Sequence, residues 1–145
     1  MKVLKFLFSL IYAVLLIYAV FFARRRRHIP ERYLNIVPLK NLVKDFHTLK
    51  DNHETINYFF DLVGNILLFM PYTFILIILY NYKNNKILLL SAFLLSICIE
   101  VLQYAFQVGV ADIDDVILNT AGALVGILLC RQLKKIMPAM QLSNN

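Results

Sequence analysis

The chain of 145 residues is 60% hydrophobic and 17% charged, with a mean hydropathy of +0.67. A soluble domain of this size is about half apolar and about a quarter charged. The composition therefore excludes an ordinary soluble domain and favours a protein that places its apolar surface in a bilayer. The formal charge is +6. Because the cations flank apolar segments, we expect membrane lipids with anionic headgroups as partners and no nucleic acid.

Four apolar runs follow one another along the chain, at residues 3–22, 62–80, 87–106 and 116–130. A helix needs roughly 20 residues to cross the hydrocarbon core, and the first three runs reach that length. The fourth is short unless residues 113–115 extend it. We therefore predict an all-α integral membrane bundle of four transmembrane helices, formed by one domain over residues 1–145.

The first run shares with signal peptides two early cations, Lys2 and Lys5, before an apolar stretch. The run is long, however, and arginines follow it at once at 24–27. A small-x-small cleavage motif is also missing, because Phe21 lies two residues before Ala23. These features favour an uncleaved membrane anchor.

The long connection after the first run contains an amphipathic pattern. Its apolar side holds Leu39, Leu42, Val43, Phe46 and Leu49. Polar residues at the intervening positions fall on the opposite side. This pattern predicts a helix lying in the headgroup plane, and the alternative is a helix that caps the bundle.

Four crossings place both termini and the 81–86 hairpin on one side of the membrane, here named side A. The first connection and the 107–115 loop then lie on side B. Side A carries seven of the fifteen Lys and Arg residues, and side B carries the other eight. The side A residues are Lys2, Lys5, Lys83, Lys86, Arg131, Lys134 and Lys135. The positive-inside rule therefore gives no orientation.

Polar residues within the third run share one helical face. Ser96, Glu100, Gln103 and Gln107 are spaced four, three and four residues apart. Glu100 lies roughly 9 Å along the helix axis from the side B end. An ionisable group at that depth usually faces the bundle interior or a watery cavity.

The fourth run repeats this spacing with Asp115, Asn119, Gly122 and Gly126. The two glycines form a small-xxx-small motif, which is typical of close packing between membrane helices. Chance is the alternative explanation, since glycine is common in such helices. The shared face with Asn119 favours a packing seam that presents Asn and Asp above it.

The second run adds Asp61 and Asn65, one turn apart near its side B end, and Pro71 in its middle. Proline deprives the carbonyl of Leu67 of its helical donor and tends to kink the helix. A neighbouring side chain or a water is expected to satisfy that carbonyl where the helices pack.

Three helices thus place carboxylates and amides at one level. The candidate site residues are Asp61, Asn65, Glu100, Gln103, Asp115 and Asn119, with Asp112 and Asp114 in the loop above. One interpretation is that these residues only form hydrogen bonds between helices, each of which contributes well under about 1 kcal/mol. Hydrogen bonds that only hold helices together need no carboxylate. A buried Glu beside further acids therefore favours a functional pocket.

Four blocks of the chain, in order, resemble the VanZ-like family of small bacterial membrane proteins. They are Leu-Asn-Ile-Val-Pro at 34–38, Asn-Ile-Leu-Leu-Phe-Met-Pro at 65–71, Ser-Ile-Cys-Ile-Glu-Val-Leu-Gln at 96–103 and Asp-Ile-Asp-Asp-Val-Ile-Leu-Asn-Thr-Ala-Gly at 112–122. Gly126 extends the last block, so the core resemblance covers residues 34–126. Many members carry Arg in the loop before the Asp block, where this chain reads Gly-Val-Ala at 109–111.

The resemblance implies a cell-envelope context, because the family takes its name from glycopeptide resistance, in particular reduced sensitivity to teicoplanin. It implies no reaction. Glycopeptides act on the outer face, so the resemblance places side B outside and the termini in the cytoplasm. The arginines at 24–27 argue for the reverse orientation.

The leading hypothesis is an intramembrane site for an envelope lipid or a lipid-linked precursor. Glu100 is its acid–base candidate, because a buried carboxyl can exchange its proton near neutral pH. Asp115 is the partner of Glu100, and Asn65, Gln103 and Asn119 would orient a hydroxyl-rich headgroup. The alternative is a non-catalytic protein whose polar cluster only holds the bundle together.

A metal site is a third possibility, since Asp112, Asp114 and Asp115 are closely spaced oxygen donors. The alternative is an acidic turn at the N-terminus of the fourth helix, where Asp is favourable. No His or Cys lies in the cluster, which argues against zinc. We expect neither a metal nor a cofactor.

Overall fold

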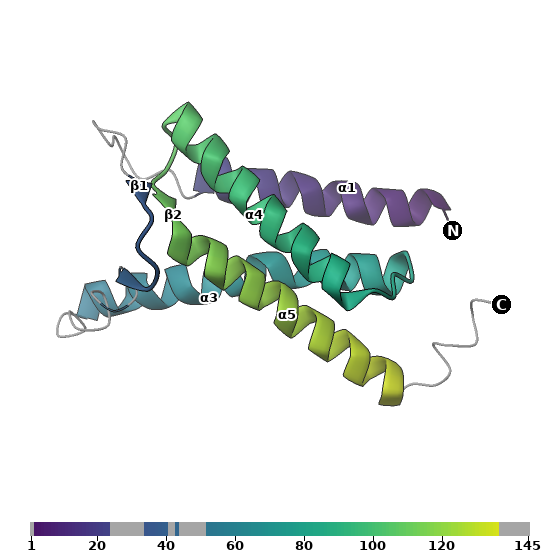
Figure 1. Ribbon diagram of the computed structural model, residues 1–145. Helices are drawn as coiled ribbons and strands as arrows, with labels where there is room; N and C mark the ends of the chain where they lie inside the picture. Colours follow the sequence, from purple (N-terminus) through teal and green to yellow (C-terminus); the bar gives the residue numbers. More distant parts are fainter. Residues whose placement is uncertain (1, 24–33, 41–42, 44–51, 137–145) are drawn as a thin grey trace.

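The computed structural model describes residues 2–23, 34–40, 43 and 52–136, and between 52 and 61 it describes the side chain of Phe59 alone. Helix α1 (Lys2–Tyr18) continues into the π-helical segment η1 (Ala19–Ala23). Helix α3 (Asn52–Phe74) continues likewise into η2 (Ile75–Leu79). Helices α4 (Asn85–Phe106) and α5 (Ile113–Ile136) complete the bundle (Figure 1).

Four helices are long and apolar enough to cross a membrane, which confirms the predicted fold class. They are Lys2–Phe22, Leu62–Leu79, Asn85–Phe106 and Ile113–Lys135. The fourth span does include residues 113–115, because Asp114 and Asp115 stand in the first turn of α5 and favour its N-terminus. The amphipathic helix predicted after residue 38 lies largely outside the described residues.

The start of α1 and the end of α5 lie at one end of the bundle together with the α3–α4 hairpin, and this end is side A (Figure 1). At the opposite end, side B, two short strands pair in parallel: β1 (Leu34–Asn35) and β2 (Ala111–Asp112). Leu34 aligns with Ala111, and Asn35 with Asp112. Strands of two residues are too short to show a periodic pattern, so this pair was not predicted. It joins the first connection to the acidic loop.

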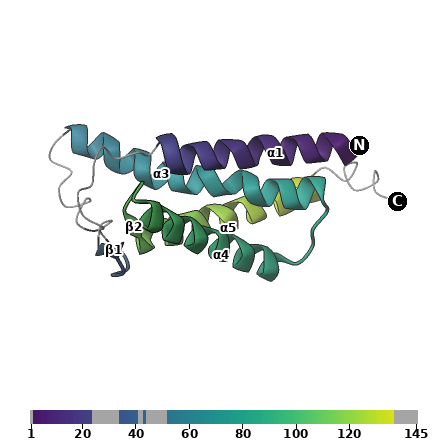
Figure 2. The same cartoon turned by 90° about the horizontal axis from the view of Figure 1, so that it is seen from above.

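Helices α3 and α5 form the central contact of the molecule and lie between α1 and α4 in Figure 2. The two glycines of α5 face α3. A Cβ at Gly122 would clash with the carbonyl oxygen of Ile66, and one at Gly126 would clash with the Thr73 hydroxyl. The same hydroxyl donates to the carbonyl of Ala123 at 3.2 Å. Because Gly122 and Gly126 have no side chains, the backbones of α3 and α5 can approach each other closely.

Pro71 does not end α3, which continues to Phe74 before its last turn becomes the π-helical η2. The proline side chain is exposed on the outer surface of the helix, away from the glycine seam. The Tyr12 hydroxyl of α1 donates to the carbonyl of Leu68 at 3.0 Å, one residue beyond the carbonyl that loses its helical donor. Side chains from α1 thus reach the backbone of α3 at this level.

Candidate functional site

The β1–β2 pair brings together two polar residues that are 77 positions apart in the chain. Asn35 is only 3% exposed and donates from Nδ2 to Oδ1 of Asp112 at 2.8 Å. Its own Oδ1 accepts the backbone N–H of Val37 at 3.3 Å. Asn35 is therefore held at both ends of its amide and fixes the Asp112 carboxylate beside α4.

Glu100 lies directly beneath this pair and is 7% exposed. Its Oε2 accepts the backbone N–H of Asp112 at 2.9 Å. The Asp112 carboxylate in turn accepts the backbone N–H of Asp114 at 2.9 Å. Asp112 therefore connects β1, α4 and the first turn of α5, and its backbone N–H helps to position the Glu100 carboxyl.

The second predicted carboxylate, Asp115, is contacted from α3. Asn65 is fully buried and donates from Nδ2 to Oδ1 of Asp115 at 2.6 Å. This bond joins residues 50 positions apart. Among the residues that the structure describes, none forms a hydrogen bond with the amide oxygen of Asn65. A buried acceptor without a donor carries a desolvation cost that a bound hydroxyl or water would relieve.

One helical turn deeper, α4 and α5 share a second polar contact. Asn119 donates from Nδ2 to the Ser96 hydroxyl at 2.8 Å, and both residues are buried. Within the described part of the chain, the amide oxygen of Asn119 also has no hydrogen-bond partner. The stripes predicted on the third and fourth runs therefore face each other inside the bundle.

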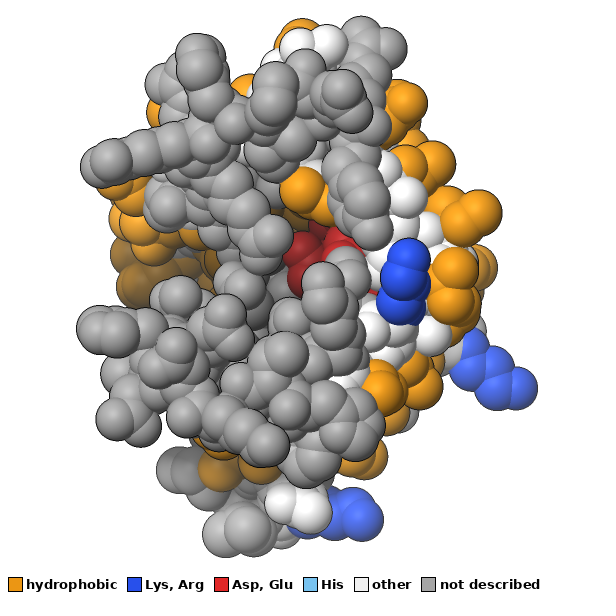
Figure 3. Space-filling view, turned by 90° about the vertical axis from the view of Figure 1, so that its left-hand side faces the viewer, with side chains coloured by type: hydrophobic (Ala, Val, Ile, Leu, Met, Phe, Trp, Pro, Cys, Tyr) orange, Lys and Arg blue, Asp and Glu red, His pale blue; other side chains and the backbone are white. Residues whose placement is uncertain are grey.

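A pocket of about 380 Å³ opens beside Glu100 at this end of the bundle. Its surface is formed almost wholly by apolar groups, from side chains such as Ile97, Val101 and Val116. The lining residues also include Asn35, Glu100, Tyr104 and Asp112. Viewed from side B, acidic side chains are visible in a hollow at the centre of the face (Figure 3). Ligand pockets have this size and this combination of apolar walls with few polar groups.

Most of the chain is similar to a known protein family. The model of the VanZ/LLP1 family matches residues 7–135. The chain belongs to the VanZ/LLP1 family. It is also similar to Protein VanZ of Enterococcus faecium, with 36% identity over 73 residues. That alignment covers 49% of this chain and 44% of the relative, so the match spans less than half of either protein. No solved structure matches the chain.

Not every residue expected to bind a ligand in this VanZ/LLP1 protein lines the pocket. Gln103 donates from Nε2 to the carbonyl of Val20 at 3.0 Å, and thereby ties η1 to α4. Asn119 lies one turn below the level of Glu100, against Ser96. The side chain of Asp61 lies outside the described residues. Glu100 and Asp112 are the predicted site residues that do line the pocket.

Asn35 is the pocket residue that the helical stripes did not indicate. It stands outside the apolar runs, so no helical periodicity connects it to Glu100. Its block at 34–38 was visible only through the resemblance to the family. Asp114 is also more deeply placed than a loop acid suggests, being 3% exposed, with its Oδ1 accepting the backbone N–H of Leu39.

The acidic residues of the VanZ/LLP1 site are engaged with backbone and amide donors. Among the residues that the structure describes, no group of three or more His, Cys, Asp or Glu side chains is placed to hold a metal ion. Asp112 accepts the backbone N–H of Asp114 in the turn that begins α5, and Asp114 accepts the backbone N–H of Leu39 in the first connection. The carboxylates thereby organise the β1–β2 end of the fold.

Proposed function

We propose that the pocket at side B binds an envelope lipid or a lipid-linked precursor, and that this protein thereby contributes to resistance against glycopeptides such as teicoplanin. The observation that carries the proposal is the position of Glu100. A carboxyl that is nearly buried in a membrane-spanning helix lines an apolar pocket together with Asn35 and Asp112. Intramembrane carboxyls are costly and commonly mark functional sites.

The composition of the pocket matches a molecule with two chemically different parts. The apolar walls suit a hydrocarbon chain, and the carboxyl and amide groups at one edge suit hydroxyls of a headgroup. Glu100 would then act as the acid or base at a headgroup hydroxyl, since its Oε2 is held by the Asp112 backbone. Asp115, which accepts a hydrogen bond from Asn65, does not line the pocket, so Glu100 is the acid–base group of the proposed site.

A second candidate function rests on the hydrogen bonds that the polar residues make with one another. Gln103 with Val20, Asn119 with Ser96 and Asn65 with Asp115 each join two different helical segments. Such bonds are what a non-catalytic membrane protein would use to hold its bundle together. Under this alternative, an amide in place of Glu100 would serve as well as the carboxyl.

The substitution Glu100→Gln separates the two functions. We expect a teicoplanin-sensitive host that expresses the wild-type chain to gain resistance, and Glu100→Gln to lose that gain at equal protein level in the membrane. The amide keeps the size of the side chain and can still accept the Asp112 N–H, so the bundle should remain folded. The readout is the minimal inhibitory concentration of teicoplanin.

Asp114→Asn is the matched control, because it also converts a carboxylate to an amide at side B but does not line the pocket. It should retain resistance. Unchanged resistance in Glu100→Gln would reject the site and leave the structural alternative. If neither the wild type nor any variant alters teicoplanin sensitivity, the proposed link to resistance is wrong.

We further propose that side A faces the cytoplasm and that the pocket faces outward, where glycopeptides act. Green fluorescent protein fused after Asn145 should then fluoresce, and alkaline phosphatase fused at the same position should be inactive. Active phosphatase would reverse the orientation. The pocket would then open toward the inner leaflet, and a precursor on that leaflet would be the ligand to test.

A further inference from the structure

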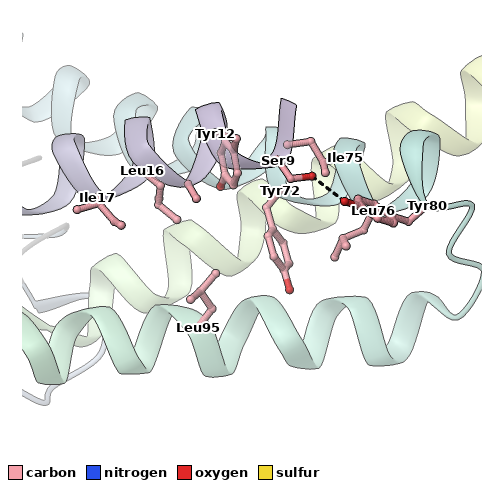
Figure 4. Close-up of a pocket in the computed structure, with 10 residues that line it drawn as sticks. Ser9, Tyr12, Leu16, Ile17, Tyr72, Ile75, Leu76, Tyr80 and Leu95 are labelled. Atoms are coloured by element: carbon pink, nitrogen blue, oxygen red, sulfur yellow. Dashed lines mark hydrogen bonds between the residues drawn. The ribbon is translucent and has the colours of Figure 1, made fainter. Parts of the chain in front are cut away.

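A second, larger pocket lies within the membrane-spanning part of the molecule, remote from Glu100. It has a volume of about 480 Å³ and lies between α1 on one side and α3, η2 and α4 on the other. In Figure 4, Leu16 of α1 and Leu95 of α4 point toward one another across it, while Tyr72 extends from α3 toward α4. We name this space the α1 groove. Its volume lies within the range of ligand pockets.

The hydroxyl groups of the α1 groove are already hydrogen-bonded within the protein. The bonds join Ser9 with Tyr80 at 3.1 Å, Tyr12 with the Leu68 carbonyl at 3.0 Å and Tyr72 with Ser91 at 2.9 Å. The remaining lining is aliphatic, as at Ile17, Ile75 and Leu76. Because no lining hydroxyl requires water, the groove suits a hydrocarbon chain.

Lys5 lies on the face of α1 that lines the groove. The less exposed positions of α1 include Lys5, Ser9, Tyr12 and Leu16, which are spaced four, three and four residues apart. Lys5 is therefore on the face that lines the groove, one turn nearer to side A, and the Ser9 hydroxyl donates to its carbonyl at 3.0 Å. Within the described residues, its ammonium group has no carboxylate partner.

The surroundings of Lys5 are basic as well. In the described parts of side A, residues 2–5, 81–86 and 131–136 contain Lys and Arg but no Asp or Glu. Two of these cations are occupied with carbonyls: Arg131 donates to Lys83 O at 2.8 Å and Lys134 to Ile77 O at 3.1 Å. Lys5 is distinguished from the other side A cations by its place on the helix face that lines the groove, near the level expected for lipid phosphates.

We propose that the α1 groove is a binding site for an anionic glycerophospholipid of the side A leaflet, with one acyl chain in the groove and the headgroup phosphate at Lys5. In α1, only 6% of an apolar 18-residue stretch is buried inside the protein. Surrounding lipid would therefore supply most of the contacts of this helix. A helix of a second copy is the competing occupant. The cation aligned with an apolar groove favours the phospholipid, which carries both complementary parts.

The experiment uses the absence of tryptophan from the chain. Ile17→Trp places one emitter at the groove, on an exposed position that tolerates a larger side chain. The full chain is reconstituted in vesicles containing phosphatidylglycerol or phosphatidylcholine with brominated acyl chains, which quench tryptophan on contact. We expect brominated phosphatidylglycerol to bind with about a five-fold preference, as for one lysine at an anionic surface.

Lys5→Gln in the same background should bring the preference close to one. Lys135→Gln, which removes an exposed cation at the end of α5, should leave it unchanged. Leu128→Trp, on the exposed face of α5, should show no preference between the two lipids. Leu76→Trp on the opposite wall of the groove is a second reporter if Ile17→Trp does not fold.

Equal quenching by the two lipids at both groove reporters would overturn the proposal, as would a preference that survives Lys5→Gln. Absence of quenching by either lipid would also overturn it, because protein would then cover the groove, and cross-linking between copies would identify a second chain as the occupant. These outcomes are independent of Glu100→Gln, which acts at the other end of the bundle.

Discussion

In α5, 44% of an apolar 18-residue stretch is buried inside the molecule, whereas only 6% of the corresponding stretch of α1 is buried. Helix α5 meets α3 backbone to backbone through Gly122 and Gly126. Helix α1 meets the bundle through a few contacts and across a groove. The difference indicates two separate tasks: the α3–α5 seam supports the polar site, and α1 presents an apolar surface to lipid.

The same contrast distinguishes the two ends of the bundle. At side B, carboxylates and amides from β1, α3, α4 and α5 bind one another. At side A, Arg131 and Lys134 bind backbone carbonyls at the hairpin and at the end of η2. Polar groups at side B therefore join several segments of the bundle to one another, while Arg131 and Lys134 at side A bind backbone carbonyls near helix ends.

The largest effect is expected where the seam itself is blocked. Gly122→Leu would place side-chain atoms against the Ile66 backbone, which cannot move without displacing α3. We expect a loss of about 3 kcal/mol or more in unfolding free energy. Unfolding in mixed micelles, followed by circular dichroism, measures it. Val125→Leu on the exposed face of α5 is the control, and an equal loss there would show that the seam is not special.

A smaller loss is expected when β1 is released from Asp112. Asn35→Ala removes a 2.8 Å bond to a carboxylate and leaves that group with one donor fewer. We expect a loss of about 2 kcal/mol, in the range of hydrogen bonds to charged groups. Asn85→Ala at side A, whose amide oxygen accepts from Arg131 in an exposed hydrogen bond, should cost less. A larger loss at Asn85 would reverse the ranking of the two ends.

Next in size is the buried bond between Ser96 and Asn119. A double-mutant cycle with Ser96→Ala and Asn119→Ala should give a coupling of about 0.6 to 1.7 kcal/mol, as measured for buried polar pairs in membrane proteins. Pairing Ser96→Ala instead with Thr120→Ala should give a coupling near zero, because Thr120 donates to its own helix. Additive single effects in the first cycle would exclude an energetic role for this bond.

The smallest effect is expected on the lipid-facing surface of α1. Leu15→Ala alters an exposed position and should change the unfolding free energy by less than about 0.5 kcal/mol. Val20→Ala alters a position of η1 that is 2% exposed, and should cost about 1 kcal/mol or more. Comparable losses at the two positions would mean that α1 is packed against protein on both faces.

Local patterns in the sequence were enough to predict the helices and their faces. Apolar length predicted four spans, because a bilayer requires an uninterrupted apolar helix of defined length. Helical spacing placed Ser96 with Glu100 and Asn119 with Gly122, because residues three and four apart share a face whatever the rest of the chain does. Each of these inferences depends on neighbours within a few turns of one helix.

Only the tertiary structure decided which faces meet and what they enclose. Asn35 reaches Asp112 across 77 positions, and Asn65 reaches Asp115 across 50. Gln103, on the same stripe as Glu100, turns instead to a carbonyl of η1. A helical stripe states which side chains point together, but helix crossing, the two-residue β1–β2 pair and the π-helical ends determine their partners. Those features arise from packing between distant segments, and so did the pocket beside Glu100 and the groove beside α1.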